Sequence, residues 1–148
     1  MQYFLLVFMA IIAGALLPFQ AGLNAQLGKS VSSDVYGAML SLVIGALGMV
    51  IYAIASGVPF AKISDAKGLS WWVWTGGLMG AFYVLSIIVV APRLGVALTF
   101  GITVAAQMLF SLATDHYGWF DLPVDTISWA KVLGVLLIIG GVVLIRAV

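Results

Sequence analysis

Long uncharged runs alternate with short charged segments along this chain. The runs cover residues 1–28, 35–61, 68–92, 94–114 and 132–145. A helix needs about 20 apolar residues to cross the hydrocarbon core of a bilayer, and four runs reach that length outright. The fifth run is shorter, but Lys131 and Arg146 can extend from its ends to the two interfaces. The pattern predicts five transmembrane helices, at about 3–27, 35–57, 70–91, 95–114 and 128–147.

The breaks between the runs contain residues that end or cap helices. These are Gly28, the run Ser32 to Asp34, the run Gly57 to Pro59, Ser70, and Pro92 with Gly95. Residues 115–127 are predicted to be the longest loop, and they contain three aspartates. All five tryptophans fall near predicted helix ends, as in an aromatic belt. The first run lacks a basic leading region and exceeds a signal peptide's apolar segment, so a retained span is expected.

Composition supports lipid as the solvent. Hydrophobic residues make up 64% of the 148 residues and charged residues only 7%, whereas soluble domains carry roughly 25% charged residues. A soluble enzyme, a nucleic-acid-binding protein and a disordered chain are therefore excluded. We expect an all-α integral membrane protein whose residues 1–148 form a single transmembrane domain. The sequence contains no cysteine, no metal-binding cluster and no nucleophile–base pair, so neither a cofactor nor an enzymatic activity is expected.

The basic residues do not favour either orientation in the membrane. With the N-terminus outside, Lys29, Arg93 and Arg146 lie inside. The other three, Lys62, Lys67 and Lys131, lie outside, so the bias that normally sets topology is zero. Chance can produce such a tie in a small protein. The alternative is dual topology, in which an antiparallel homodimer of ten helices reproduces the inverted repeats of larger transporters.

Small residues suggest where helices approach one another closely. The second span carries Gly37, Ser41, Gly45 and Gly48, and the third carries Gly76 and Gly80. Packing within the chain is the preferred interpretation for these two spans. In the last span, Gly134 and Gly141 are seven residues apart and share one face of an otherwise aliphatic helix. We predict that this strip contacts a second copy of the chain.

Uncharged polar side chains mark a candidate substrate site. Gln20 and Asn24 share a face of the first span, just after Pro18, which removes a backbone hydrogen bond and is expected to loosen the helix. Gln107 lies near the middle of the fourth span. Amides in hydrocarbon are costly unless they meet water, a ligand or each other. We predict that the three amides line a shared cavity for a neutral or weakly charged solute, although packing between helices would also explain them.

The fourth span carries a polar ladder at four-residue spacing. Its members are Thr99, Thr103, Gln107 and Ser111. Thr103 and Ser111 are included among the candidate substrate-binding residues. For Thr99 and Ser111 the preferred interpretation is packing, because hydroxyl side chains often bond within their own helix.

No carboxylate falls inside any predicted span. Proton-coupled cation export normally requires one in the membrane. Asp115 and His116, at the end of the fourth span, are the nearest titratable pair. They are candidates for proton coupling, although an interfacial loop charge would also explain Asp115.

Two polar motifs stand out in the sequence. One is residues 17–28, which read Leu-Pro-Phe-Gln-Ala-Gly-Leu-Asn-Ala-Gln-Leu-Gly. The other runs from Gln107 to Asp115, His116, Tyr117 and Gly118. Both resemble motifs of the YdcZ family (also called DUF606) of the drug/metabolite transporter superfamily, with Tyr117 where that family usually has phenylalanine. The segment from Gly134 to Val142 is similar to the dimerising last helix of small multidrug resistance proteins, with Val135 in place of leucine.

The resemblance implies a five-helix half-transporter of the bacterial inner membrane, and it supplies no substrate. The small multidrug resistance proteins have a glutamate in their first helix, and this chain has none. The expected activity is transport of a small organic solute by alternating access. Two alternatives stay open, a passive channel lined by amides and hydroxyls and a non-transporting assembly subunit that binds another protein.

Overall fold

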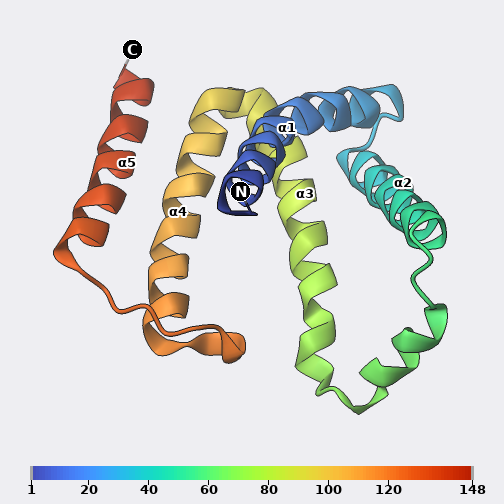
Figure 1. Ribbon diagram of the computed structural model, residues 1–148. Helices are drawn as coiled ribbons and strands as arrows, with labels where there is room; N and C mark the ends of the chain where they lie inside the picture. The colour runs from blue at the N-terminus through green and yellow to red at the C-terminus, as the bar shows by residue number, and fades with distance from the viewer. Residues whose placement is uncertain (1, 148) are drawn as a thin grey trace. The chain divides into compact units, whose positions relative to one another are not determined.

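The computed structural model describes residues 2–147, and all of their regular elements are helical (Figure 1). Five helices are long and apolar enough to cross a membrane. They are α1 (Gln2–Ser30), α2 (Asp34–Ala55), α3 (Thr75–Leu94), α4 (Val96–Tyr117) and α5 (Trp129–Ala147). The prediction of an all-α chain with five spans is confirmed for these residues. Met1 and Val148, the ends of the predicted single domain, lie outside the described residues.

The connections contain short 3-10 helices. These are η1 (Phe60–Gly68) and η2 (Trp71–Trp74) between α2 and α3, and η3 (Trp119–Asp121) between α4 and α5. The connection from α2 to α3 is the longer of the two, so the prediction that residues 115–127 form the longest loop is wrong. The reason is that α4 continues to Tyr117, while the α-helical part of the third span begins only at Thr75.

Two of the predicted helix boundaries have the expected capping residue or glycine, while Ser70, Pro92 and Gly28 do not act as predicted. The extended backbone of Ser33 (φ −159°, ψ 118°) lets its Oγ accept from the Tyr36 N–H at 3.3 Å, which caps α2. Gly57, with φ +67°, follows the end of α2. Ser70, predicted as a cap, makes no side-chain capping bond, and it precedes η2 rather than α3.

Proline does not end α3. The helix continues through Pro92 to Leu94, and Gly95, whose φ is +86°, stands between it and α4. Pro92 removes a single backbone hydrogen bond in the last turn, which the helix tolerates so close to its end. The break between the two helices lies where predicted, and glycine supplies the positive φ found there.

The described chain divides into two compact units, residues up to Pro92 and residues from Arg93 onward. In the first unit, α1 packs on α2 through two glycines. A Cβ atom at Gly37 would lie 2.7 Å from the Gly28 Cα and 2.8 Å from its nitrogen. The two backbones therefore touch directly, as small residues allow in membrane helices. The predicted role of Gly37 in packing within the chain is confirmed.

The other glycines of α2 and α3 have no such contact. A Cβ at Gly45, Gly48, Gly76 or Gly80 would meet nothing within 4 Å among the described residues. The prediction of packing within the chain is therefore wrong at these four positions. The buried face of α3 instead consists of Ile87, Ile88 and Ala91, and the Ile88 Cγ2 lies 3.6 Å from where a Gly28 Cβ would be.

In the second unit, α4 packs on α5, and η3 packs on the end of α4. A Cβ at Gly101 would lie 2.9 Å from the Val142 Cγ2. The two helices are antiparallel, so Gly101 near the start of α4 meets the C-terminal half of α5. Glycine at position 101 gives the valine side chain room to pack against the α4 backbone.

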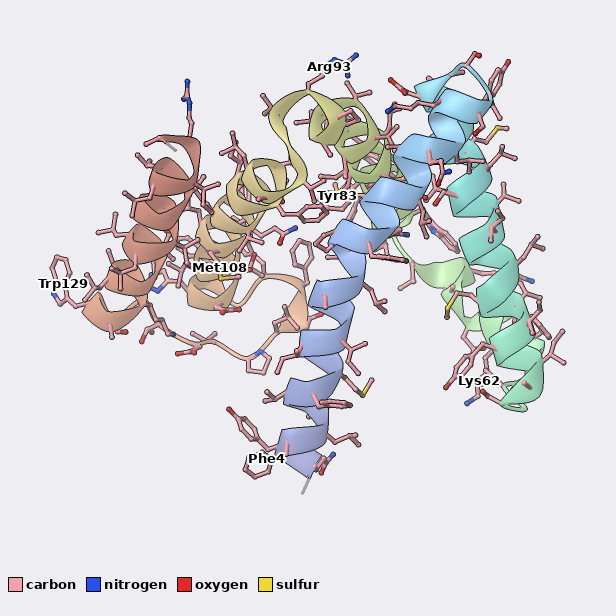
Figure 2. The ribbon with its side chains drawn as sticks, turned by 90° about the horizontal axis from the view of Figure 1, so that it is seen from above. Phe4, Lys62, Tyr83, Arg93, Met108 and Trp129 are labelled. Carbon is pink, nitrogen blue, oxygen red and sulfur yellow. The ribbon has the colours of Figure 1, made fainter. Side chains whose placement is uncertain are left out.

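All five tryptophans are exposed and lie next to helix ends. Three of them form most of η2, one begins η3, and Trp129 begins α5. Figure 2 shows the Trp129 ring projecting away from its helix. Exposed indoles at the ends of apolar helices are typical of an aromatic belt at the membrane interface.

Candidate functional site

One face of α1 carries a hollow of about 350 Å³ that contains the first predicted amides. Gln20 and Asn24 line it together, as their spacing predicted. Its other lining residues are Leu16, Leu17, Phe19 and Leu23. The hollow is therefore mostly apolar, with two amides that could orient a bound molecule.

Asn24 is the more informative of the two amides. Its residue surface is 8% exposed, whereas Gln20 is exposed. Its backbone oxygen lies 3.4 Å from the Cβ position of Gly37, so the residue stands where α1 and α2 approach most closely. Among the described residues, the Asn24 side chain has no hydrogen bond. The amide opens into the hollow, and at membrane depth such a group needs a water molecule, a ligand or another protein chain as its hydrogen-bond partner.

Pro18 does not interrupt the helix beside this hollow. The sequence suggested a loosened backbone like that of the broken helices of transporters, but α1 continues from Gln2 to Ser30 with Pro18 inside it. Figures 1 and 2 show α1 as one continuous ribbon that bends along its length. A bend without a break is the usual effect of proline, because only one backbone hydrogen bond is lost.

The hydroxyls of the α4 ladder bond to their own helix. Thr99, 2% exposed, donates to the Gly95 oxygen at 2.7 Å. Thr103 donates to the Phe100 oxygen at 3.0 Å. The packing interpretation of Thr99 agrees with its bond, and Thr103 behaves in the same way. The Thr103 oxygen keeps lone pairs with which it can still accept a hydrogen bond.

The ladder does not follow a single straight face. At about 100° per residue, each step of four residues advances about 40° around the helix. The ladder therefore turns from Thr99 on one side of α4 to Ser111 on another. Gln107 is exposed and has no hydrogen bond among the described residues. The next step after Ser111 is Asp115, so the polar track ends on the carboxylate.

Ser111 and Asp115 enter a groove between α4 and α5. The groove has a volume of about 370 Å³. Its polar lining residues are Ser111, Asp115 and Lys131. The others are small or apolar, namely Met108 (labelled in Figure 2), Leu112, Gly134, Val135 and Ile138. Sequence spacing could not find this groove, because its two walls come from helices whose register is set by tertiary packing.

Lys131 is held by the loop that precedes α5. Its Nζ lies 2.5 Å from Asp125 Oδ1 and donates to the Thr126 oxygen at 2.9 Å. A further bond, of 3.4 Å, reaches the Asp125 oxygen. The sequence suggested that Lys131 extends toward an interface, and the ammonium group instead closes the loop on its own helix.

His116 also bonds to this loop. Its Nδ1 accepts from the Ile127 N–H at 3.4 Å, and the Asp115 backbone oxygen accepts from the Asp125 N–H at 2.9 Å. Accepting at Nδ1 requires the tautomer with the proton on Nε2. The pair proposed for proton coupling therefore lies in the last two turns of α4, where both residues hold the following loop.

The two glycines proposed for dimer contact remain uncovered within the chain. A Cβ at Gly134 or Gly141 would meet nothing within 4 Å among the described residues. Gly134 also borders the groove between α4 and α5. At about 100° per residue, the two glycines lie within about 20° of each other around α5, beside the face that contacts α4.

Five of the predicted site residues fall into two sets, each within one unit. Gln20 and Asn24 share the α1 hollow, and Ser111, Asp115 and Gly134 share the groove between α4 and α5. Thr103 and Gln107 line neither of these two spaces. Within residues 2–147, no group of three histidine, cysteine or acidic side chains could hold a metal ion.

Comparison with known proteins identifies a family. The chain matches no curated protein and no solved structure. Residues 5–144 match the family described as "Putative inner membrane exporter, YdcZ". This match covers all five spans and places the chain in the inner membrane as a multi-pass protein. The resemblance seen in the two polar motifs is thereby confirmed, and the chain belongs to the YdcZ family of inner membrane proteins.

Proposed function

We propose that this protein exports a small organic solute, neutral or weakly charged, across the inner membrane by alternating access. The observation that carries the proposal is Asn24, an amide that is 8% exposed, unbonded within the described chain and open to the α1 hollow. A packing residue at this position would gain nothing from an unpaired amide. A solute that accepts or donates hydrogen bonds supplies the missing partner.

Gln20 and Gln107 complete the polar site in this proposal. Gln20 lines the same hollow as Asn24, and exposed Gln107 lies near the middle of α4. A glutamine amide at mid-membrane depth needs a polar partner. The three amides line one cavity at the interface of two inverted copies, and Thr103 and Ser111 extend its polar track along α4.

The transporting unit in this proposal is an antiparallel homodimer of dual topology. Three observations support it, namely the equal division of basic residues between the two sides, the odd number of spans and the open strip at Gly134 and Gly141. With an odd number of spans, a duplicated copy joined in tandem would insert in the inverted orientation, which is the arrangement of inverted-repeat transporters, and two separate copies of opposite topology reproduce it. Asp115 and His116 are the groups through which proton coupling would run.

The test is transport by purified protein in liposomes, with a solute chosen by thermal-shift screening of the protein in detergent. Gln20→Leu, Asn24→Leu and Gln107→Leu should each abolish saturable transport and leave the fold and dimer intact. Gln26→Leu is the matched control, because it removes an exposed amide of α1 that lies outside the hollow. Normal transport by Gln107→Leu would contradict the site. Flux that does not saturate would indicate a channel, and capture of a stable partner without flux would indicate an assembly subunit.

Topology can be tested separately, because the natural chain has no cysteine. Ser30→Cys and Ala66→Cys lie on opposite sides of the membrane in any one copy. With dual topology, an impermeant thiol reagent should label a fraction of each from outside the cell. Complete labelling of one site and none of the other would exclude dual topology.

A further inference from the structure

Charge is unevenly compensated in the groove between α4 and α5. Lys131 directs its ammonium group at Asp125 and Thr126, with bonds to three oxygens of that loop. An ammonium group has three donors, so these bonds use its full capacity. The positive charge of Lys131 is thereby neutralised by Asp125, which does not line the groove.

Asp115 has no such partner. Its carboxylate lines the groove and is half-buried. Within residues 2–147, no side chain forms a salt bridge or a hydrogen bond with it. The groove is therefore lined by a lysine that forms an ion pair with Asp125 and by a carboxylate that has no ion-pair partner among the described residues. A half-buried carboxylate at the end of a membrane span attracts a cation, because fewer water molecules screen it there.

We propose that this groove binds an amphipathic amine, with the ammonium group on Asp115 and the apolar body along the groove. Ser111, one helical turn before Asp115, offers a hydroxyl that can accept a second ammonium proton. Met108, Leu112 and Ile138 form the apolar wall beyond it. One carboxylate without an ion-pair partner among the described residues, in an otherwise mostly apolar groove, matches a ligand with a single amine and a hydrocarbon tail.

The size of the groove limits the ligand. A volume of about 370 Å³ lies near the lower end of the range of about 300–1,000 Å³ that is common for small-molecule sites. The site therefore suits an amine with one ring or a short chain. Gly134 borders the groove without a side chain, so a second copy that covers the glycine strip of α5 would also lie beside the bound ligand.

This inference rests on the proposed function only in treating the amine as cargo, and the positive charge of the amine distinguishes this groove from the uncharged amide site. Binding is tested without transport. Phenylbutylamine, phenylbutanol and phenylbutanoate share a carbon skeleton and differ in charge. Equilibrium dialysis would measure the binding of each to the full chain in phosphatidylcholine nanodiscs, with empty nanodiscs subtracted.

The expected order of affinity is amine, then alcohol, with the carboxylate weakest. Asp115→Asn should weaken amine binding by about tenfold or more, since hydrogen bonds to charged groups are the stronger kind, and Asp115→Glu should restore part of it. Asp121→Asn is the matched control. It removes an acid of the same connection outside the groove, at a left-handed backbone position that asparagine also accepts.

Lys131→Gln distinguishes the amine from an anionic ligand. Amine binding should not weaken in this variant, because it removes a positive charge from the lining of the groove and leaves Asp115 in place. A groove that uses Lys131 to bind carboxylates would instead lose phenylbutanoate binding in this variant. Equal binding of the amine and the alcohol, or equal affinity of Asp115→Asn and Asp121→Asn for the amine, would overturn the proposal. Amine binding without transport would contradict the exporter and leave this site standing.

Discussion

The two helix pairs of this protein pack in different ways. In the first, α1 and α2 meet backbone to backbone, and a Cβ at Gly37 would lie 2.7 Å from the Gly28 Cα. In the second, Gly101 accommodates a valine side chain of α5 near one end, while the other end opens into a groove of about 370 Å³. Two facing glycines leave no volume between helices, whereas one glycine opposite a side chain closes the contact only locally.

This difference separates structural from functional glycines. Lipid is as apolar as the side chains, so membrane helices associate through close packing rather than through the hydrophobic effect. A contact without space cannot hold a ligand, and its role is to fix the angle between α1 and α2. The groove between α4 and α5 has space and carries a carboxylate. The predictions below test this division, from the largest expected effect to the smallest.

Gly37→Leu should have the largest effect on folding. Its Cβ would collide with the α1 backbone, which has no flexible side chain to move. Overpacking typically costs about 1–3 kcal/mol, and a clash with backbone belongs at the top of that range. Thermal unfolding in detergent should show a melting temperature far below that of the natural chain, or no folded protein at all. Gly45→Leu, on the same helix in open space, is the control, and equal melting of the two variants would refute the contact.

Gly141→Leu should leave each chain folded and separate the proposed dimer. No described atom lies within 4 Å of its Cβ position, so the added side chain disturbs only a partner. Cross-linking and size-exclusion chromatography in detergent should show a monomer. Gly76→Leu adds the same bulk at an open position of α3 and should stay dimeric. An unchanged dimer in Gly141→Leu would remove α5 from the interface.

Gly101→Ala should have a smaller effect on stability than Gly37→Leu. The new methyl group meets the Val142 Cγ2 at 2.9 Å, and a side chain can shift where a backbone cannot. We expect a loss of about 1 kcal/mol, at the low end for overpacking. Val142→Ala should rescue it, so the double variant should unfold above the temperature at which Gly101→Ala unfolds. If the losses of unfolding free energy in Gly101→Ala and Val142→Ala simply added up in the double variant, the two residues would not be in contact.

The sequence predicted the spans well because the bilayer sets their length and their lack of charge. The cap at Ser33 and the pairing of Gln20 with Asn24 are local features. In each, the interacting residues are about one helical turn apart, so spacing in the sequence was enough to predict them. The α4 ladder was also visible, and its continuation to Asp115 follows from the same spacing. Tertiary register was not accessible, so the Gly101 contact and the groove at Lys131 were missed.

Glycine spacing was a poor guide to which contacts form. Of the three glycines in α2, Gly37 alone meets a neighbouring helix closely among the residues that the structure describes. A glycine lets backbones approach but does not require it, and the choice depends on the angle between helices that the connection at residues 31–33 imposes. The prediction that Pro18 loosens the first span was also wrong. The loss of one backbone hydrogen bond bends a long helix without interrupting it.

The smallest effect is expected at Thr99, the buried polar residue of the second unit, compared with Asn24 of the first. Both are at least nine-tenths buried. The Thr99 hydroxyl bonds to the Gly95 oxygen, and that oxygen also accepts from the Thr99 backbone N–H at 3.1 Å. Valine has nearly the same shape, so Thr99→Val leaves the carbonyl satisfied and should cost no more than about 1 kcal/mol.

Asn24→Leu should behave in the opposite way. It removes an unpaired amide, so its stability should be equal or higher, while transport is lost. Measuring unfolding and transport for both variants therefore distinguishes a hydroxyl that hydrogen-bonds within its own helix from an amide whose proposed role is to bind a ligand. If Thr99→Val abolished transport while Asn24→Leu preserved it, the polar site would lie on α4 rather than in the α1 hollow.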